Sequence, residues 1–240
     1  AEFRQLSESV NGMLDRLAQS FDAQRQFTGN AAHELRTPLA LMQTRLELFA
    51  AEHRQMSEET AKLLHFQQEQ VERLSALVRT LLEMSDLRSV PRTDRIDLAP
   101  MAEEVLVDLT PLAQKNGITL TQTGENVQLT GSDVLLYRVL FNLTENAIKY
   151  NRTGGSVELS VEQEGGQAAI RVRDTGPGIA EEEQPKIFQR FYRGTAYREQ
   201  EGVGIGLYLV RQIAEGQGGF VKVRSQPGQG STFSLYLPRK

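Results

Sequence analysis

Hydrophobic residues in the first fifty positions follow the spacing of a coiled coil. They occur at Leu6, Val10, Met13 and Leu17, in steps of four, three and four residues, which is a heptad pattern. The pattern predicts one long helix, or two joined helices, over residues 1 to about 50.

A second amphipathic helix is predicted after a polar break at residues 52–57. Ser57 followed by two glutamates has the composition of a helix start. The apolar seam of this helix, which runs to about Leu87, consists of Leu64, Val71, Leu74, Val78 and Leu81. Two such helices joined by a short turn cannot bury both apolar stripes alone, so we expect two copies to pair as a four-helix bundle. The chain is therefore predicted to be a homodimer.

The pattern changes after residues 88–95, which mix proline with charge and are predicted to be a linker. Beyond them, short alternating runs predict strands and amphipathic runs predict helices. The predicted strands are residues 118–123, 126–130, 156–163, 167–174, 220–225 and 231–237, and the predicted helices are 100–116, 133–150 and 202–215. Gly165 and Gly166 connect one hairpin, and residues 227–230 connect another. We expect a two-layer α+β sandwich with an antiparallel or mixed sheet and helices on one face.

Composition narrows the possible functions only slightly. The 240 residues carry a formal net charge of −4 without any basic run, so the chain is not expected to bind nucleic acid. It has no cysteine, which excludes disulfides and thiolate metal sites. No apolar run is long enough to span a bilayer. Because the chain begins within a helical pattern and without Met, we expect a fragment of a longer protein.

Residues 27–38, FTGNAAHELRTP, place three chemically useful side chains on one predicted helix. His33 and Thr37 are four positions apart and share a helical face, with Glu34 beside the imidazole. Pro38 has no N–H for the carbonyl of Glu34, which weakens or bends the helix within a turn of His33. A titratable residue next to such a defect is a candidate site, whereas the other two histidines have ordinary polar neighbours.

The seven residues from His33 to Leu39, HELRTPL, resemble the phosphoacceptor box of the sensor histidine kinases of two-component signalling. The resemblance implies that His33 accepts a phosphoryl group with Glu34 as its acid/base helper. Thr37 could align a water that dephosphorylates a partner, or it could simply bond back to a helical carbonyl. Residues 2–14 look like the last helix of a HAMP signalling linker, with a plain dimerising helix as the alternative.

The predicted helix of residues 133–150 carries a polar stripe. Asn142, Asn146 and Lys149 lie at i, i+4 and i+7, and the apolar residues fall roughly opposite. Two amide oxygens and an ammonium can hold a hydrated Mg²⁺ and triphosphate oxygens. The alternative is an ordinary solvated helix face.

Asp174 begins a second polar motif, which continues through Gly176 and Gly178 to Ile179 after a predicted strand. An aspartate there can accept a hydrogen bond from the exocyclic amine of adenine, and the glycines let the backbone approach the ring. A simple tight turn is the alternative.

The third motif is the glycine run Gly202, Gly204 and Gly206, followed by Leu207 at the start of a helix. Backbone N–H groups at a helix N-terminus favour phosphate. The spacing is not that of a Rossmann motif, and no Walker lysine follows.

Together and in this order, the three motifs are similar to the ATP-binding domain of histidine kinases, which has a Bergerat-type fold. The resemblance implies that Asn146 binds Mg²⁺, that Asn142 and Lys149 face the phosphates, that Tyr150 lies by the nucleotide and that Asp174 binds adenine. Phe188, Phe191, Tyr192 and Arg193 match the phenylalanine box of the lid. Core packing is the alternative role for the two phenylalanines.

Asn142 separates the chain from other Bergerat-fold ATPases. Relatives such as the heat-shock chaperone, gyrase and mismatch-repair enzymes have a water-activating glutamate at this position, four residues before the metal-binding asparagine. An amide has no basic lone pair to take a proton, so we expect slow hydrolysis of ATP. Residual hydrolysis assisted by the nearby carboxylate of Glu145 is the alternative.

The resemblance implies a chain of four parts: residues 1–20 as a signalling coiled coil, 21–87 as the dimerisation and phosphotransfer domain, 88–95 as the linker and 96–240 as the ATP-binding domain. The implied activity is Mg-ATP-dependent autophosphorylation of His33, then transfer to an aspartate of a response regulator, with an opposing phosphatase activity. The chain would be the cytoplasmic portion of a bacterial inner-membrane sensor. The alternatives are a Bergerat-fold ATPase and a nucleotide-regulated dimeric binding module with a vestigial histidine box.

Overall fold

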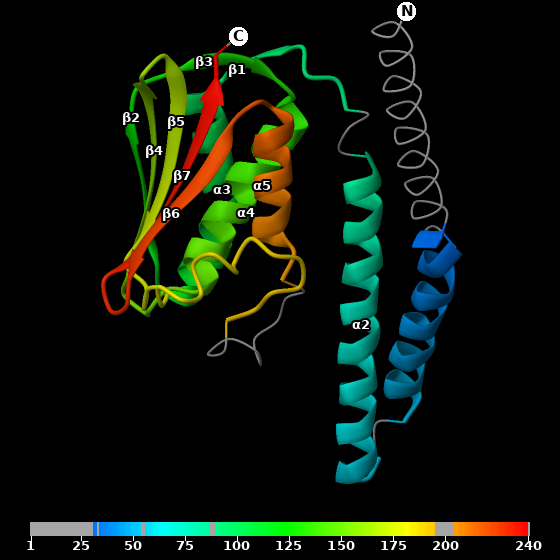
Figure 1. Cartoon of the computed structure of the whole chain (residues 1–240). Coiled ribbons are helices and arrows are strands. Elements are labelled where there is room, and N and C mark those ends of the chain that lie inside the picture. Colours follow the sequence, from blue (N-terminus) through cyan, green and yellow to red (C-terminus); the bar gives the residue numbers. More distant parts are fainter. Residues whose placement is uncertain (1–30, 33, 54–55, 87–89, 195–203, 240) are drawn as a thin grey trace, which may run out of the picture. The chain divides into compact units, whose positions relative to one another are not determined.

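The computed structural model describes residues 31–32, 34–53, 56–86, 90–194 and 204–239. The chain divides into two compact units, Ala1–Asp86 and Leu87–Lys240 (Figure 1). None of the helices in the described ranges is long and apolar enough to cross a membrane.

The first unit is a hairpin of two helices, as predicted. Residues 31–32 and 34–52 are helical, and α2 (Glu58–Asp86) follows. The side chain of Ser57 accepts a hydrogen bond from the N–H of Thr60 at 3.2 Å, which confirms the predicted helix start. The first helix continues through Pro38, so the proline removes one hydrogen bond without ending the helix.

Packing inside the hairpin uses only part of its apolar surface. Ala32, Leu39 and Val78 form a buried cluster between the helices, and Val71 is also buried. Leu74, from the same predicted seam, is 48% exposed. Further exposed apolar side chains on the hairpin are Leu35, Leu41, Met42, Leu48, Phe49, Leu63 and Phe66. The hairpin therefore keeps the uncovered apolar surface on which the dimer prediction depends.

The second unit contains a five-stranded mixed sheet in the order β2-β4-β5-β7-β6. Its strands are β2 (Thr119–Gly124), β4 (Ser156–Glu164), β5 (Gln167–Asp174), β6 (Phe220–Gln226) and β7 (Gly230–Pro238). β2 pairs parallel with β4, and the other neighbours pair antiparallel. Both predicted hairpins, β4–β5 and β6–β7, are confirmed.

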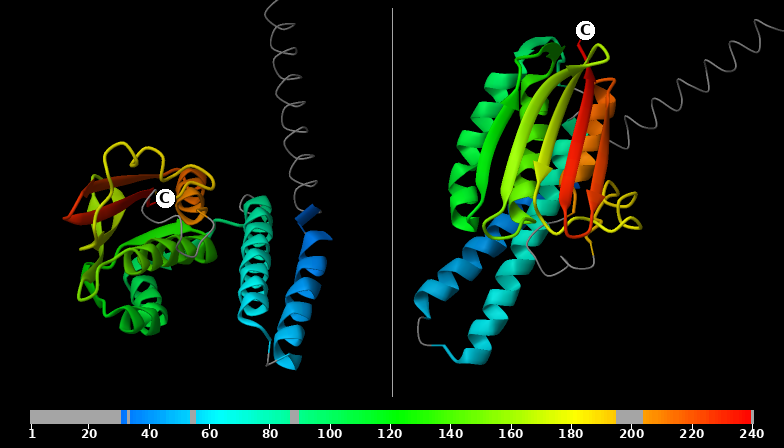
Figure 2. Two further views of the ribbon diagram at one scale, coloured as in Figure 1. Left: turned by 90° about the horizontal axis from the view of Figure 1, so that it is seen from below. Right: turned by 90° about the vertical axis from the view of Figure 1, so that its left-hand side faces the viewer.

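Three helices cover one face of this sheet and leave the other face open (Figure 2). They are α3 (Leu98–Asn116), α4 (Asp133–Lys149) and α5 (Gly206–Gly216). The side chain of Ser132 accepts the N–H of Leu135 and caps α4, while Gly117, at φ 67°, ends α3 in the left-handed conformation. Alternate strand residues such as Val157, Leu159 and Val161 are fully buried under the helices.

One strand was not predicted. β1 (Asp94–Asp97) pairs with β3 (Gln128–Gly131) in a small antiparallel sheet, so the last two residues of the predicted linker 88–95 are strand. Only Ile96 of β1 is buried, and one apolar residue among three charged ones gives no alternating pattern to detect. Residues 94–97 form a strand because they pair with β3.

Candidate functional site

The polar stripe of α4 lies where the sequence predicts it. Asn142 and Asn146 are half-buried and Lys149 is exposed. The apolar residues predicted opposite, Leu136, Leu140, Leu143 and Ala147, are all buried in the core. The amide nitrogen of Asn142 donates to the carbonyl of Arg138 at 3.0 Å, which leaves its amide oxygen as an acceptor on the other side.

The start of α5 lies against this stripe. A Cβ added to Gly206 would lie 3.3 Å from Oδ1 of Asn142 and 3.8 Å from Nδ2 of Asn146. Ile205, the N-cap residue of α5, provides no side-chain cap, so the N–H groups of the first turn, which includes Leu207, lack intrahelical acceptors. Two carboxamides and an uncapped helix N-terminus thus meet at a glycine, which is an arrangement suited to an anion.

Gly204 shows why a glycine is required just before this helix. Its φ is +73°, and a Cβ there would lie 2.6 Å from the carbonyl oxygen of Tyr192 and 3.0 Å from the side chain of Arg193. Gly204 therefore lies against the predicted phenylalanine box. Gly202 belongs to residues 195–203, outside the described part of the chain.

Asp174 is fixed at the end of β5. It is only 8% exposed, and its Oδ1 accepts the backbone N–H of Gly176 at 2.8 Å and of Ser231 at 3.2 Å. Burial raises the pKa of the Asp174 carboxyl, and the hydrogen bonds from Gly176 and Ser231 act in the opposite direction. Asp174 is thus a buried, oriented carboxylate at a strand end, which is compatible with the predicted role as an acceptor for adenine.

The turn after Asp174 is more than a simple tight turn. A Cβ on Gly176 would lie 2.7 Å from the carbonyl oxygen of Tyr150, so the turn lies directly against the end of α4. Gly178, at φ +74°, packs against the backbone of Gln226. The N–H of Ile179 donates to the hydroxyl of Ser225 at 2.8 Å. All three motifs therefore contact one another through α4: Gly206 at its polar stripe and Gly176 at its end.

Lys149 forms an ion pair with Glu145, one turn earlier on α4, at 2.9 Å. The lysine side chain is 40% exposed, and an exposed i, i+4 pair contributes only about 0.3–0.5 kcal/mol. The pair is therefore weak enough for a phosphate to draw Lys149 away.

The two phenylalanines of the lid differ. Phe188 is buried and contacts Phe233 edge to face, with ring centroids 6.4 Å apart, so core packing is correct for this residue. Phe191 is 54% exposed with φ 62°, so core packing is wrong for it. A positive φ in a bulky residue marks local backbone strain. Arg193 is half-buried beside Gly204.

The histidine box is only partly described. His33 lies outside the described residues, whereas Glu34 and Thr37 are exposed on the first helix. The HAMP-like segment 2–14 is also outside the described residues.

Sequence reasoning missed three polar residues that shape the site around Asp174. Asn151 donates to the carbonyl of Ser156 at 3.1 Å, and the hydroxyl of Thr175 accepts the N–H of Ser156 at 2.8 Å. The backbone N–H of Ser231, on β7, donates a hydrogen bond to the carboxylate of Asp174. Asn151 and Thr175 are immediate neighbours of predicted site residues, so their positions carried a signal, but nothing in the local sequence indicates Ser231.

The described residues contain no cluster of three or more His, Cys, Asp or Glu side chains that could hold a metal ion. Mg²⁺ commonly takes one or two protein oxygens and completes its shell with phosphates and water. The carboxamides of Asn142 and Asn146 beside Gly206 fit that mode of binding.

The fold and the site define a class of protein: a helical hairpin followed by an ATP-binding domain of Bergerat type. Comparison with protein families agrees. Residues 23–90 match the His Kinase A (phospho-acceptor) domain, and residues 131–240 match the histidine kinase-, DNA gyrase B- and HSP90-like ATPase. The chain belongs to the sensor histidine kinases of two-component signalling.

Individual relatives extend over nearly the whole chain. The sensor protein kinase PmrB of Pseudomonas aeruginosa is 36% identical over 242 aligned residues, which cover 99% of this chain and 50% of PmrB. The sensor-like histidine kinase SenX3 of Mycobacterium tuberculosis is 33% identical, over 90% of this chain and 54% of SenX3. The chain thus spans about half the length of the curated relatives it matches.

Solved structures share the fold. Full-length ShkA in complex with AMPPNP superposes with a TM-score of 0.68 at 24% identity, covering 89% of this chain and 45% of ShkA. The histidine kinase ThkA in complex with the response regulator protein TrrA gives 0.62 at 23% identity, over 90% of this chain and 61% of that one.

Proposed function

We propose that this chain binds Mg-ATP in the second unit and transfers the γ-phosphoryl group to His33. The observation that supports this most strongly is the contact of Gly206 with Asn142 and Asn146, because it brings an uncapped helix N-terminus and two carboxamides to one point. The family to which the chain belongs makes a phosphate the natural occupant.

Each residue then has a defined role in holding the nucleotide. Asp174 accepts the exocyclic amine of adenine, with Gly176, Gly178 and Ile179 lining the approach and Tyr150 beside it. Asn142, Lys149 and the N–H groups of the first turn of α5 bind phosphate oxygens, and Arg193 and the glycine run close over them. Asn146 holds Mg²⁺, which supplies positive charge to the phosphate oxygens when it is bound.

The transfer step requires a nucleophile and a leaving group in line. One ring nitrogen of His33 attacks the γ-phosphorus, the bond to the bridging oxygen breaks, and ADP leaves with the electron pair. Glu34 accepts a hydrogen bond from the other ring N–H and balances the positive charge that develops on the imidazole. Because Asn142 cannot deprotonate water, hydrolysis does not compete strongly with this step.

The product, a phosphorus–nitrogen bond, is reactive and suited to onward transfer. We propose that the acceptor is an aspartate of a response regulator, and that Thr37 aligns a water that hydrolyses the regulator's aspartyl phosphate to inorganic phosphate and a free carboxylate, which opposes the transfer. The structure of ThkA in complex with TrrA supports this kind of partner. We further propose that the chain is a homodimer and the cytoplasmic portion of a membrane sensor.

The direct test incubates the purified chain with radioactive γ-phosphate-labelled ATP and Mg²⁺ and maps the labelled residue. We expect a label that is stable to base and labile to acid, and that is abolished in His33→Gln. His53→Gln and His65→Gln are matched controls, because both histidines are exposed on the same hairpin, and both variants should label normally.

The same experiment separates the alternative functions. A plain ATPase would release phosphate steadily in His33→Gln as in the wild type, with no labelled protein. A nucleotide-regulated binding module would bind ATP without labelling or phosphate release. Either result would overturn the proposed transfer.

A further inference from the structure

Residues 180–194, the lid segment, are attached to the first turn of α5 by one arginine and one tyrosine. The guanidinium of Arg190 donates a hydrogen bond to the hydroxyl of Tyr208 at 2.6 Å, and its central carbon lies 4.7 Å from the centre of the tyrosine ring. The second contact is within the range of a cation–π interaction. Tyr208 is the third residue of α5 and follows Gly206 by two positions, so the pair lies next to the proposed phosphate site.

The electrostatics of α5 do not explain the position of Arg190. The N-terminus of a helix carries a partial positive charge, so a cation beside its first turn is disfavoured. Side chains on a helix lean towards the N-terminus, and Tyr208 therefore leans towards Gly206. The position of the guanidinium is thus set by Tyr208 and not by the charge of the helix.

The same turn of the lid segment contacts the approach to α5 at a second point. A Cβ added to Gly204 would lie 2.6 Å from the carbonyl oxygen of Tyr192 and 3.0 Å from Cγ of Arg193. Phe191 lies between the two points of attachment, with its φ at 62°. A bulky residue keeps such a strained backbone only where its surroundings fix it. The contacts at Arg190 and at Gly204 supply that restraint.

The earlier part of the lid segment is fixed by other means. The side-chain amide of Gln184 donates hydrogen bonds at 3.0 Å to two backbone carbonyls, one of them that of Ser225 on β6. Phe188 is buried in the core. Residues 189–194, the rest of the segment, are all exposed or half-buried. The position of this last stretch therefore depends on surface contacts such as the arginine–tyrosine pair.

We propose that Arg190 and Tyr208 are positioning residues for the triphosphate of the bound nucleotide. Their contact holds the turn of residues 190–193 on the start of α5. This keeps the side chain of Arg193 beside Gly204, where the phosphates are proposed to lie. Recognition of adenine does not depend on the contact, because it is assigned to Asp174 on β5. The inference rests on the proposed binding of ATP and adds two residues to that site.

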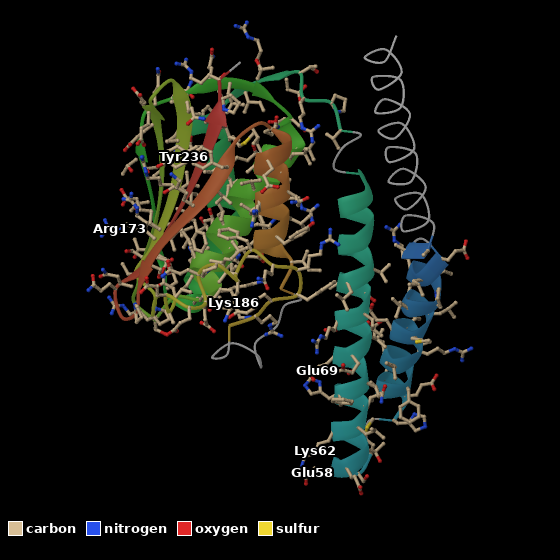
Figure 3. The ribbon with its side chains drawn as sticks, in the orientation of Figure 1. Glu58, Lys62, Glu69, Arg173, Lys186 and Tyr236 are labelled. Atoms are coloured by element: carbon tan, nitrogen blue, oxygen red, sulfur yellow. The ribbon has the colours of Figure 1, made fainter. Side chains whose placement is uncertain are left out.

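The test compares the affinity of the full chain for a non-hydrolysable ATP analogue with Mg²⁺ and its affinity for adenosine, both by calorimetric titration. We expect Arg190→Gln and Tyr208→Ala each to bind the analogue about fivefold more weakly, as for loss of one exposed hydrogen bond and cation–π contact. Adenosine, which has no phosphate, should bind equally to all variants. Lys186→Gln is the matched control, because Lys186 is another exposed cation on the lid segment (Figure 3), and it should bind the analogue as the wild type does.

A double-mutant cycle tests whether the two residues act together. Arg190→Gln combined with Tyr208→Ala should bind the analogue no more weakly than either single variant, since both changes remove the same contact. Tyr208→Phe, which keeps the ring, should recover part of the affinity. If Arg190→Gln weakens binding and Tyr208→Ala does not, the arginine acts alone and the proposal is wrong. Equal losses for adenosine and for the analogue would indicate a purely structural role and would also overturn it.

A readout without nucleotide separates this inference from the proposed function. The chain has no tryptophan, so Phe191→Trp introduces a single fluorophore between the two points of attachment. In that background, Tyr208→Ala should lower the fluorescence anisotropy of the tryptophan, and Lys186→Gln should not. A wild type that binds no ATP analogue would refute the proposed function and with it the positioning role. Unchanged anisotropy in Tyr208→Ala would refute the attachment alone.

Discussion

At the scale of single residues, Asp174 carries a buried charge whose desolvation opposes folding. It is almost fully buried, and only hydrogen bonds compensate for the loss of water around its charge. A neutral residue of the same shape would avoid that cost, but it would present an N–H as well as an oxygen to the nucleotide. The buried charge therefore agrees with the proposed binding of adenine, since it does not favour folding.

Asp174→Asn is expected to bind a non-hydrolysable ATP analogue at least about tenfold more weakly, which corresponds to about 1.4 kcal/mol or more. The melting temperature at neutral pH should be unchanged or higher. Calorimetric titration and thermal melting measure the two quantities. Asp133→Asn, which removes an exposed carboxylate from the first turn of α4, is the control and should leave the affinity unchanged.

The pH dependence of the free energy of unfolding tests whether the charge of Asp174 is buried at a cost. Because the pKa of Asp174 is raised in the folded chain, the folded state binds this proton more tightly than the unfolded state. Its contribution to folding is complete below the ordinary aspartate pKa and is lost as the pH rises through the raised pKa. The stability of the wild type relative to Asp174→Asn should therefore decline across that interval and level off above it. A constant difference at all pH values would contradict the assignment.

At the scale of elements, the N-terminus of α5 depends on close approach to α4. Gly206 has no positive φ to demand a glycine, yet a Cβ there would press on the carboxamide of Asn142. The helix itself would tolerate alanine, which is a better helix former than glycine. The glycine is therefore better explained by the space that it leaves beside the carboxamides.

Gly206→Ala is expected to fold normally and to bind the ATP analogue roughly five- to tenfold more weakly, because the added methyl displaces the amide that faces the phosphates. Gly216→Ala is the matched control in the same helix, since a Cβ there meets only the guanidinium of Arg92, at 3.0 Å. Titration of both variants under identical conditions gives the comparison. If the two variants bind equally well, the proposed site at the start of α5 is wrong.

At the scale of the whole molecule, the two units have different sources of stability. The second unit has a closed core between its sheet and three helices. The hairpin buries only a narrow seam and leaves Leu63, Phe66 and Leu74 about half exposed on α2. Positions related by i, i+3 and i+11 share one side of a helix, so these residues form a stripe that a second copy can cover.

Leu74→Glu is expected to weaken the homodimer at least about tenfold for each copy changed, because burial of a leucine contributes about 1.5 kcal/mol or more. Light scattering after size exclusion should show the mass falling from twice 26.9 kDa towards 26.9 kDa. Val107→Glu, at a 64% exposed apolar position in the second unit, is the control and should remain dimeric. A wild-type chain that is monomeric at micromolar concentration would refute the dimer itself.

Elements with a strong local signal were predictable. The helix α4 begins at Asp133, where the predicted helix begins, and the hairpin β4–β5 turns at Gly165 and Gly166, because caps and positive-φ turns depend on adjacent residues. The strand β1 was not predictable, because its single buried residue acquires its role from β3. Lys149 was predictable as a position on a stripe, but its pairing with Glu145 depends on side-chain geometry.

The sequence alone determined the class of the fold, the order of its elements apart from β1, and the identity of most candidate site residues, because periodicity, caps and motif chemistry are local properties of the chain. Only the tertiary structure decided which distant residues meet. It placed Gly206 against Asn142, Ser231 on Asp174, and Arg190 on Tyr208. These contacts join residues far apart in sequence, and they arise from strand register and helix packing, which minimise the free energy of the whole domain rather than of any one segment.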